Sequence, residues 1–251
     1  MADVLVDWSD YDAVLFDLDG VITPTAEVHM RAWSEMFNEY LSHRGEEADE
    51  PYTDADYFEH VDGKPRYDGV RDFLASRDIT LPQGTPDDLP DVVSVCGLGN
   101  RKNEAFSEVL RSEGVAAYPG SLALLEQLKA SGMKMAIVSS SKNAPDVLDT
   151  AGVSDYFSVV VHGGVATERG LKGKPAPDTY EAAADELGVP HRKSVVVEDA
   201  TSGVAAGAAG DFGLVIGVDR GVGVEALEKA GADVVVADLA ELTVPGSGAD
   251  A

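Results

Sequence analysis

The stretch Ala13-Val14-Leu15-Phe16-Asp17-Leu18-Asp19-Gly20 places two carboxylates, two residues apart, directly after an apolar run and before a glycine. A strand buried on both faces of a parallel sheet has such a continuous apolar run. In open α/β sheets, ligands bind at the carboxyl ends of the strands. The stretch therefore predicts that Asp17 and Asp19 lie at the mouth of a sheet, where Gly20 lets the chain turn around a ligand. A solvated acidic turn would give the same local pattern.

The composition is that of a globular protein with an unusually acidic surface. The chain has 251 residues, 44% of them hydrophobic, which is enough for one large domain or two smaller ones. Its net charge is −26, from 45 acidic and 19 basic residues. This charge argues against nucleic acid and anionic membranes as partners, because both carry dense negative charge. An anionic substrate would need local cations to overcome the same field.

Other sequence features bear on the compartment. The chain has no apolar run of transmembrane length and no basic, apolar leader at Met1. Its single cysteine, Cys96, cannot form an internal disulfide, and a small, partly buried side chain explains it better than a reactive thiol does. We expect a cytoplasmic protein and a monomer, although no feature of the sequence fixes the oligomeric state.

The order of the segments predicts two domains. Apolar runs alternate with helical segments from Val115 onward, which indicates a parallel sheet covered on both faces. The expected strands after the first are 134–138, 157–161, 194–197, 214–218 and 233–236. About ninety mostly helical residues separate the first strand from these, as an inserted domain would. We expect a core of residues 1–26 and 115–251 and a helical domain of residues 27–114.

The inserted segment contains three predicted helices. Apolar residues at helical spacing predict an amphipathic helix over 25–41, with Thr23 as its cap and Pro24 at its first position. A second helix should end at Ala75, and a third should span 100–111. The proline-rich and aspartate-rich residues 81–90 between them predict a loop.

Polar groups stand at the ends of the later strands. The stretch Ser139-Ser140-Ser141-Lys142-Asn143 offers hydroxyls and backbone amides near a helix start, which suit an anion. Lys174 precedes a turn stiffened by two prolines, and Glu198-Asp199 is a second acidic pair. Each motif alone has an ordinary interpretation: a helix cap, a solvated lysine and an acidic N-cap.

Together, these strand ends predict a metal-assisted phosphoryl site. Carboxylates from two strand ends, with waters and a phosphate, make the oxygen-only octahedral site that Mg²⁺ prefers. A hydroxyl and a lysine would bind the remaining phosphoryl oxygens. A divalent ion would also bring an anionic substrate to an acidic protein, so we expect Mg²⁺ as the cofactor.

The order of these motifs, over residues 13 to about 220, resembles the haloacid dehalogenase (HAD) superfamily of phosphotransferases. The resemblance implies an α/β fold: a Rossmann-like parallel-sheet core with an inserted α-helical cap. It also implies that Asp17 is a covalent nucleophile and Asp19 a general acid/base, while Ser139 and Lys174 bind the phosphoryl group.

The same resemblance supplies a ligand set for Mg²⁺. Glu198 and Asp199 would hold the ion, with Asp17 and the backbone carbonyl of Asp19 as further ligands. This arrangement suits the chemistry, because a carboxyl group that exchanges a proton is better kept off the metal.

Within the superfamily, the strings Gly20-Val21-Ile22-Thr23 and Gly173-Lys174-Pro175-Ala176-Pro177-Asp178 resemble the β-phosphoglucomutase family. The resemblance implies a small phosphorylated sugar as substrate, namely β-glucose 1-phosphate with glucose 1,6-bisphosphate. It adds four core residues to the expected substrate-binding set: Gly20, Ser141, Lys142 and Asn143.

The inserted domain carries further expected substrate contacts. Gly63-Lys64-Pro65-Arg66 matches a cap motif of that family, in which the arginine grips the distal phosphate. Arginine suits this role because its planar fork binds phosphate in a bidentate manner. Lys102 would face the sugar, His29 would help position the acid/base, and Trp33 would lie near the sugar. Each of these four residues also has a strong ordinary interpretation: a histidine and a tryptophan four apart on an amphipathic helix are more often packing residues, and Lys102 would be a solvated lysine.

Two departures from the family pattern affect substrate choice. Pro24 stands where many relatives carry aspartate in the hinge, and the segments 44–56 and 81–95 enlarge the cap. Three functions stay open: a mutase that passes the phosphoryl group from Asp17 to a sugar, a phosphatase that passes it to water, and a non-catalytic sugar-phosphate sensor.

Overall fold

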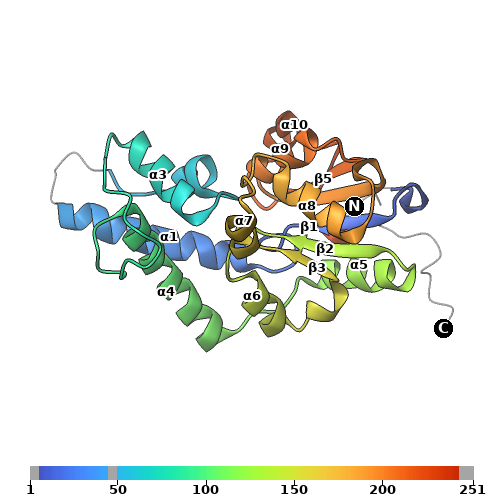
Figure 1. Cartoon of the computed structure of the whole chain (residues 1–251), viewed down its shortest axis with the longest axis horizontal. Helices are drawn as coiled ribbons and strands as arrows, with labels where there is room; N and C mark the ends of the chain where they lie inside the picture. The colour runs from blue at the N-terminus through green and yellow to red at the C-terminus, as the bar shows by residue number, and fades with distance from the viewer. Residues whose placement is uncertain (1–5, 45–49, 243–251) are drawn as a thin grey trace. The chain divides into compact units, whose positions relative to one another are not determined.

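The computed structural model describes residues 6–44 and 50–242, which form two compact units (Figure 1). The first unit lies within Met1–Pro24 and Val115–Ala251, and the second within Thr25–Gly114. The second unit therefore begins two residues before the boundary at 26/27 that the sequence suggests. Among the described residues, no helix has the length and apolar character needed to cross a membrane.

A six-stranded parallel sheet forms the centre of the first unit, as the sequence predicts. Its order is β3-β2-β1-β4-β5-β6, so the first strand lies between two strands that come much later in the chain. The strands are β1 (Ala13–Phe16), β2 (Lys134–Val138), β3 (Val159–Val161), β4 (Ser194–Glu198), β5 (Leu214–Val218) and β6 (Val234–Val236).

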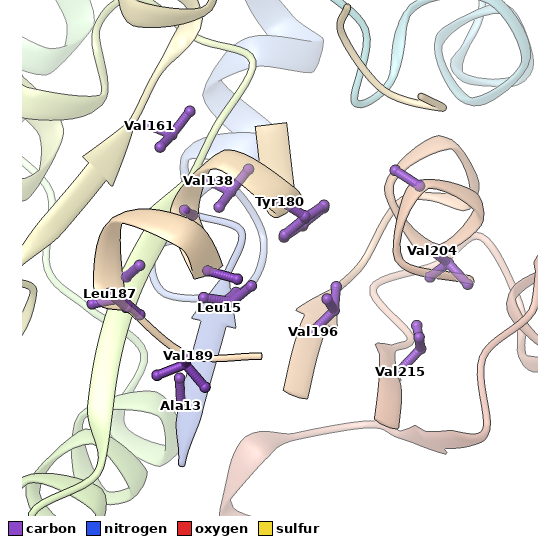
Figure 2. Close-up of a cluster of buried hydrophobic side chains, with 14 of the residues drawn as sticks. Ala13, Leu15, Val138, Val161, Tyr180, Leu187, Val189, Val196, Val204 and Val215 are labelled. Carbon is purple, nitrogen blue, oxygen red and sulfur yellow. The ribbon is translucent and has the colours of Figure 1, made fainter. Parts of the chain in front are cut away.

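Helices cover the sheet and bury its apolar side chains. All four residues of β1 have no solvent exposure, as their continuous apolar run predicts. Figure 2 shows one such buried cluster, in which Tyr180 and Leu187 pack over side chains of β1, β2 and β4. The helices of this unit are α5 (Pro119–Ala130), α6 (Ala144–Ala151), α7 (Gly163–Arg169), α8 (Asp178–Leu187), α9 (Thr201–Ala209) and α10 (Val224–Ala230), with short helical turns η1 (Trp8–Asp10), η3 (Ser154–Tyr156), η4 (His191–Lys193) and η5 (Leu239–Glu241).

The second unit is helical around an aromatic core. Phe37 stacks at 5.4 Å on Trp33 and contacts Tyr52 and Phe73 at 5.0 and 4.2 Å between ring centroids. Such aromatic clusters bury large areas and dominate small cores. Its elements are α1 (Thr25–Arg44), α2 (Asp54–Asp56), the π-helical turn η2 (Tyr57–Val61), α3 (Arg66–Ser76) and α4 (Val95–Glu113).

One expected helix cap and one expected helix start were wrong. Helix α1 begins at Thr25, as the expected range 25–41 predicts, so Pro24 is not its first residue and Thr23 is not its cap; Thr23 instead pairs with Asp19 in an isolated bridge. Helix α4 begins five residues before the expected position 100, because the Ser94 hydroxyl accepts a hydrogen bond from Gly97 N at 2.9 Å and caps the helix there. The expected loop over 81–90 has no helix or strand.

Candidate active site

Three carboxylates converge at the ends of two neighbouring strands. Asp17 follows β1, Glu198 ends β4, and Asp199 comes next. The two strands are hydrogen-bonded neighbours, and Asp17 N donates to Val197 O at 2.9 Å. All three carboxyl groups are buried, and each offers an oxygen within 4.8 Å of the others. The sheet topology thus brings Asp17 to an acidic pair that begins 181 positions later in the sequence.

Lys174 is the cation inside this cluster. Its ammonium donates to Asp17 Oδ1 and to Glu198 Oε1, each at 2.5 Å, and to Val138 O at 3.0 Å. Its side chain is only 1% exposed. A surface lysine would not give up its hydration in this way, so the solvated interpretation of Lys174 is wrong.

Burial dominates the electrostatics of the cluster. It raises the pKa of Asp17 well above its usual range, and the charges of Glu198 and Asp19 add to that effect against the opposing influence of Lys174. Burial alone would lower the pKa of Lys174, but Asp17 and Glu198 outweigh it and hold that pKa well above its usual value. The ammonium therefore stays charged between the two carboxylates.

The donor set fits a hard divalent cation. Asp17, Glu198 and Asp199 offer oxygen ligands only, as Mg²⁺ prefers. Burial and the charge of Glu198 raise the pKa of Asp17, so a further cation would favour the ionised form of this cluster. The Asp19 side chain is half-buried and is not part of this group.

The backbone of the residues next to Asp19 is fixed by the turn after β1. Gly20 has φ +85°, a conformation that glycine adopts readily, and its N–H donates to Thr23 O at 2.8 Å. A Cβ at Gly20 would lie 2.6 Å from the Asp199 carboxyl carbon and 3.3 Å from Asp199 Oδ1. Glycine is therefore needed here both for its φ and for the close approach of Asp199.

The serine-rich turn lies beside Lys174, which bonds to the carbonyl just before it. The Ser139 and Ser141 hydroxyl oxygens accept hydrogen bonds from Ser141 N and Asn143 N, both at 3.1 Å. Ser139 N donates to Val161 O within the sheet, at 3.0 Å. The hydroxyls thus order the turn through their oxygens and keep their protons for donation to an anion. Phosphate binding by Ser139, Ser141, Lys142 and Asn143 stays a prediction.

Sequence reasoning missed two residues that hold Glu198. The Tyr180 hydroxyl on α8 donates to Glu198 Oε1 at 3.1 Å, and Gly203 on α9 leaves room for the carboxylate. Ala200 N also donates to Glu198 Oε2 at 2.9 Å. The only sequence signal for Gly203 is a glycine in the first turn of a helix that follows the acidic pair.

In the second unit, Arg66 is held by amides. Its Nη1 and Nη2 donate to Asn100 Oδ1 at 3.3 Å and Asn103 Oδ1 at 2.6 Å. Tyr67 Oη donates to the same Asn100 oxygen at 2.9 Å, and the guanidinium lies 5.9 Å from the Tyr67 ring centroid. Gly63 precedes this segment in a turn with φ +68°. Arg66 is thus oriented by α4 while its charge is retained.

The other three expected residues of this unit form one cluster. His29 stacks on Phe106 with ring centroids 4.0 Å apart, and its Nδ1 contacts the Lys102 ammonium. That ammonium lies 5.0 Å from the Trp33 ring centroid and 5.1 Å from that of Phe106. Lys102 is therefore buried among aromatic rings rather than solvated. Their predicted contacts with substrate stay untested.

Comparison with known proteins agrees with this geometry. Residues 11–211 match the sequence model of the haloacid dehalogenase-like hydrolases. The chain belongs to this family. It is 48% identical over 237 residues to a β-phosphoglucomutase of Mycobacterium tuberculosis, which covers 92% of this chain and 90% of that protein.

Solved structures give the same assignment. A β-phosphoglucomutase from Clostridium difficile superposes with a TM-score of 0.73 at 26% identity, covering 93% of each chain. CbbY from Rhodobacter sphaeroides, solved with xylulose 1,5-bisphosphate, superposes with a TM-score of 0.71 at 25% identity, covering 92% of this chain and 96% of that one. The chain is a β-phosphoglucomutase-like enzyme of the HAD family.

Proposed function

We propose that the protein is a Mg²⁺-dependent phosphotransferase that converts β-D-glucose 1-phosphate to glucose 6-phosphate. The reaction would pass through phospho-Asp17 and β-glucose 1,6-bisphosphate, and we expect the enzyme to act as a cytoplasmic monomer. The observation that carries the proposal is the buried cluster of Asp17, Lys174, Glu198 and Asp199 in a chain 48% identical to a β-phosphoglucomutase.

Asp17 is placed to act as the nucleophile. One carboxylate oxygen would form a bond to phosphorus while the bond from phosphorus to the leaving oxygen breaks, and that oxygen would leave with its electron pair. Lys174 opposes the rise in the Asp17 pKa that burial causes, and its ammonium would pair with a phosphoryl oxygen. Mg²⁺ held by Asp17, Glu198 and Asp199 would supply further neutralisation of phosphoryl charge.

Asp19 would carry the proton. It would protonate the sugar oxygen that leaves when Asp17 is phosphorylated, and it would take a proton from the sugar hydroxyl that later attacks phospho-Asp17. Its side chain is not among the three carboxylates that would hold the metal, which supports this role because a group that exchanges a proton is better kept off the metal.

Arg66 supports a substrate with a second phosphate. Arg77 in the same unit pairs with the Asp56 carboxylate at 2.9 Å, whereas the guanidinium of Arg66 donates to the neutral amide oxygens of Asn100 and Asn103. Burial lowers the pKa of Arg66, so holding its charge there is costly. A phosphate on the distal end of the sugar would offset that cost.

A phosphatase is the second candidate, because the matching family is described as hydrolases. Both functions would use Asp17 and Asp19 and differ in whether water or a sugar hydroxyl attacks phospho-Asp17. Mutase activity requires that water be excluded while the sugar is bound.

Product partition distinguishes the two. Purified protein would be given Mg²⁺, β-glucose 1-phosphate and a trace of glucose 1,6-bisphosphate, and glucose 6-phosphate and free phosphate would be measured in the same sample. We expect glucose 6-phosphate to dominate. Dominant phosphate release would identify a phosphatase, and no turnover of any phosphorylated sugar would favour a sensor. An Asp17→Asn variant controls for contaminating activity.

A further inference from the structure

Arg220, just beyond the end of β5, reaches the turn that follows β1. Its Nε donates to Gly20 O at 2.9 Å and its Nη1 donates to Ala237 O at 3.1 Å. Nη1 also lies 3.6 Å from Asp238 Oδ2, and the guanidinium carbon lies 4.1 Å from the Tyr118 ring centroid. One side chain therefore joins the turn after β1 to segments that follow β5 and β6.

The hydrogen bond from Arg220 adds to the backbone hydrogen bonds that fix this turn. Gly20 N donates to Thr23 O at 2.8 Å, and Leu18 O accepts from Ile22 N at 2.9 Å and from Thr23 N at 3.0 Å. With Arg220 on Gly20 O, both backbone polar groups of Gly20 are bonded. Asp19 lies between Leu18 and Gly20, so the direction of its side chain depends on this backbone.

We propose that Arg220 is a positioning residue for Asp19. The inference rests on the proposed function, in which Asp19 is the proton carrier. Asp17 has separate supports, namely Lys174 and the backbone bond to Val197 O. Loss of Arg220 therefore slows the steps that need Asp19 and spares those that need Asp17 alone.

Tyr118 explains why the cation is an arginine. A planar guanidinium stacks on an aromatic ring while its edge donates hydrogen bonds, which a lysine ammonium cannot do in the same geometry. Tyr118 N also donates to Ile22 O at 2.9 Å, and Ser121 Oγ donates to Val21 O at 2.6 Å. The ring that Arg220 covers thus belongs to a residue bonded to the same turn.

Acetyl phosphate allows the phosphorylation of Asp17 to be measured apart from the hydrolysis of phospho-Asp17. When Asp17 attacks its phosphorus, acetate departs with the electron pair and needs no proton from Asp19, because acetate is a weak base. Decay of phospho-Asp17 is different: water attacks phosphorus, the Asp17 oxygen leaves, and Asp19 accepts the proton from water. Labelling thus reports Asp17, and decay reports Asp19, with no sugar in either assay.

The test compares Arg220→Met and Arg220→Lys with wild type. Arg192→Met is the matched control, since Arg192 is an exposed arginine of the same unit paired with Asp211 at 2.5 Å. With Mg²⁺ and acetyl phosphate, we expect Arg220→Met to label Asp17 at a rate within about 3-fold of wild type. Decay should slow by about 10-fold to 100-fold, below the full contribution of general acid–base catalysis. Arg220→Lys should restore part of the decay rate.

Amide hydrogen exchange gives a readout independent of turnover. We expect faster exchange over 18–23 in Arg220→Met and no change there in Arg192→Met. Equal losses of labelling and decay, or unchanged exchange over 18–23, would overturn the inference. Failure of wild type to make glucose 6-phosphate while these results hold would overturn the proposed function instead.

Discussion

Gly203→Ala should favour the helix but displace a ligand of the metal site. Gly203 lies in the first turn of α9, where alanine is favoured over glycine by up to about 1 kcal/mol. A Cβ there would overlap the Glu198 carboxylate, 2.6 Å from Oε2 and closer still to the other carboxyl atoms. Glu198 must therefore move.

The displacement costs more than the helix gains. Glu198 accepts hydrogen bonds from Lys174 at 2.5 Å, Tyr180 at 3.1 Å and Ala200 N at 2.9 Å. A hydrogen bond to a charged group contributes about 1.5–3 kcal/mol, so losing two of them costs about 3–6 kcal/mol. We expect a net destabilisation of about 2–5 kcal/mol, measured by urea unfolding without Mg²⁺.

The substitution should lower the affinity for Mg²⁺ as well as the free energy of unfolding. Removing a partner of a ligand lowers metal affinity about 10-fold to 100-fold, and displacing Glu198 itself should reach at least the upper figure. At a Mg²⁺ concentration 100 times the wild-type Kd, binding stabilises wild type by about 2.7 kcal/mol. A 100-fold weaker variant would gain about 0.4 kcal/mol under the same conditions.

Gly207→Ala is the matched control on the same helix. Its Cβ would meet only apolar side chains, 3.0 Å from Val196 Cγ1 and 3.2 Å from Val215. It should perturb packing but keep the wild-type stabilisation by Mg²⁺. Wild-type Mg²⁺ stabilisation and turnover in Gly203→Ala, or equal loss in both variants, would refute the assignment of Glu198 as a metal ligand.

Two further predictions concern the helical unit. Asn103→Asp places a carboxylate against the Arg66 guanidinium, so its charge is neutralised and KM for glucose 1,6-bisphosphate should rise at least about 10-fold; an unchanged KM would exclude Arg66 from phosphate binding. Burial alone would raise the pKa of Asp56, but hydrogen bonds from Arg77 and Thr53 outweigh it and hold that pKa below the usual 3.8. This stabilisation is present above the unfolded-state pKa and is lost as pH falls through the lowered folded-state pKa. Acid unfolding should therefore depend less on pH in Asp56→Asn, and identical pH profiles would contradict the assignment.

The sequence predicts the strand ends of the site well because β1, β2 and β4 are short apolar runs, each with site residues at or directly after its end. Asp17 and Glu198 could be assigned in this way without knowledge of their contacts. Their convergence then follows from a general property of parallel sheets, in which the carboxyl ends of the strands share one edge.

The residues that sequence reasoning missed act across the fold rather than along the chain. Tyr180 belongs to a helix on which Ala183, Ala184 and Leu187 are also buried, so the local pattern does not distinguish its hydroxyl from ordinary packing. Arg220 follows a strand in a loop, where a cation is usually solvated. Their partners, Glu198 and Gly20, are 18 and 200 positions away. The packing of α8 on the sheet and the pairing of β5 within the sheet bring them together.

The identity of the phosphorylated residue tests the central claim most directly. Protein quenched in acid after reaction with Mg²⁺ and acetyl phosphate would be digested, and the peptide containing Asp17 and Asp19 would be sequenced by mass spectrometry. The account predicts a phosphoryl group on Asp17, its absence in Asp17→Asn, and its retention in Asp19→Asn with slower decay. Phosphorylation of Asp19, or labelling that survives Asp17→Asn, would contradict it.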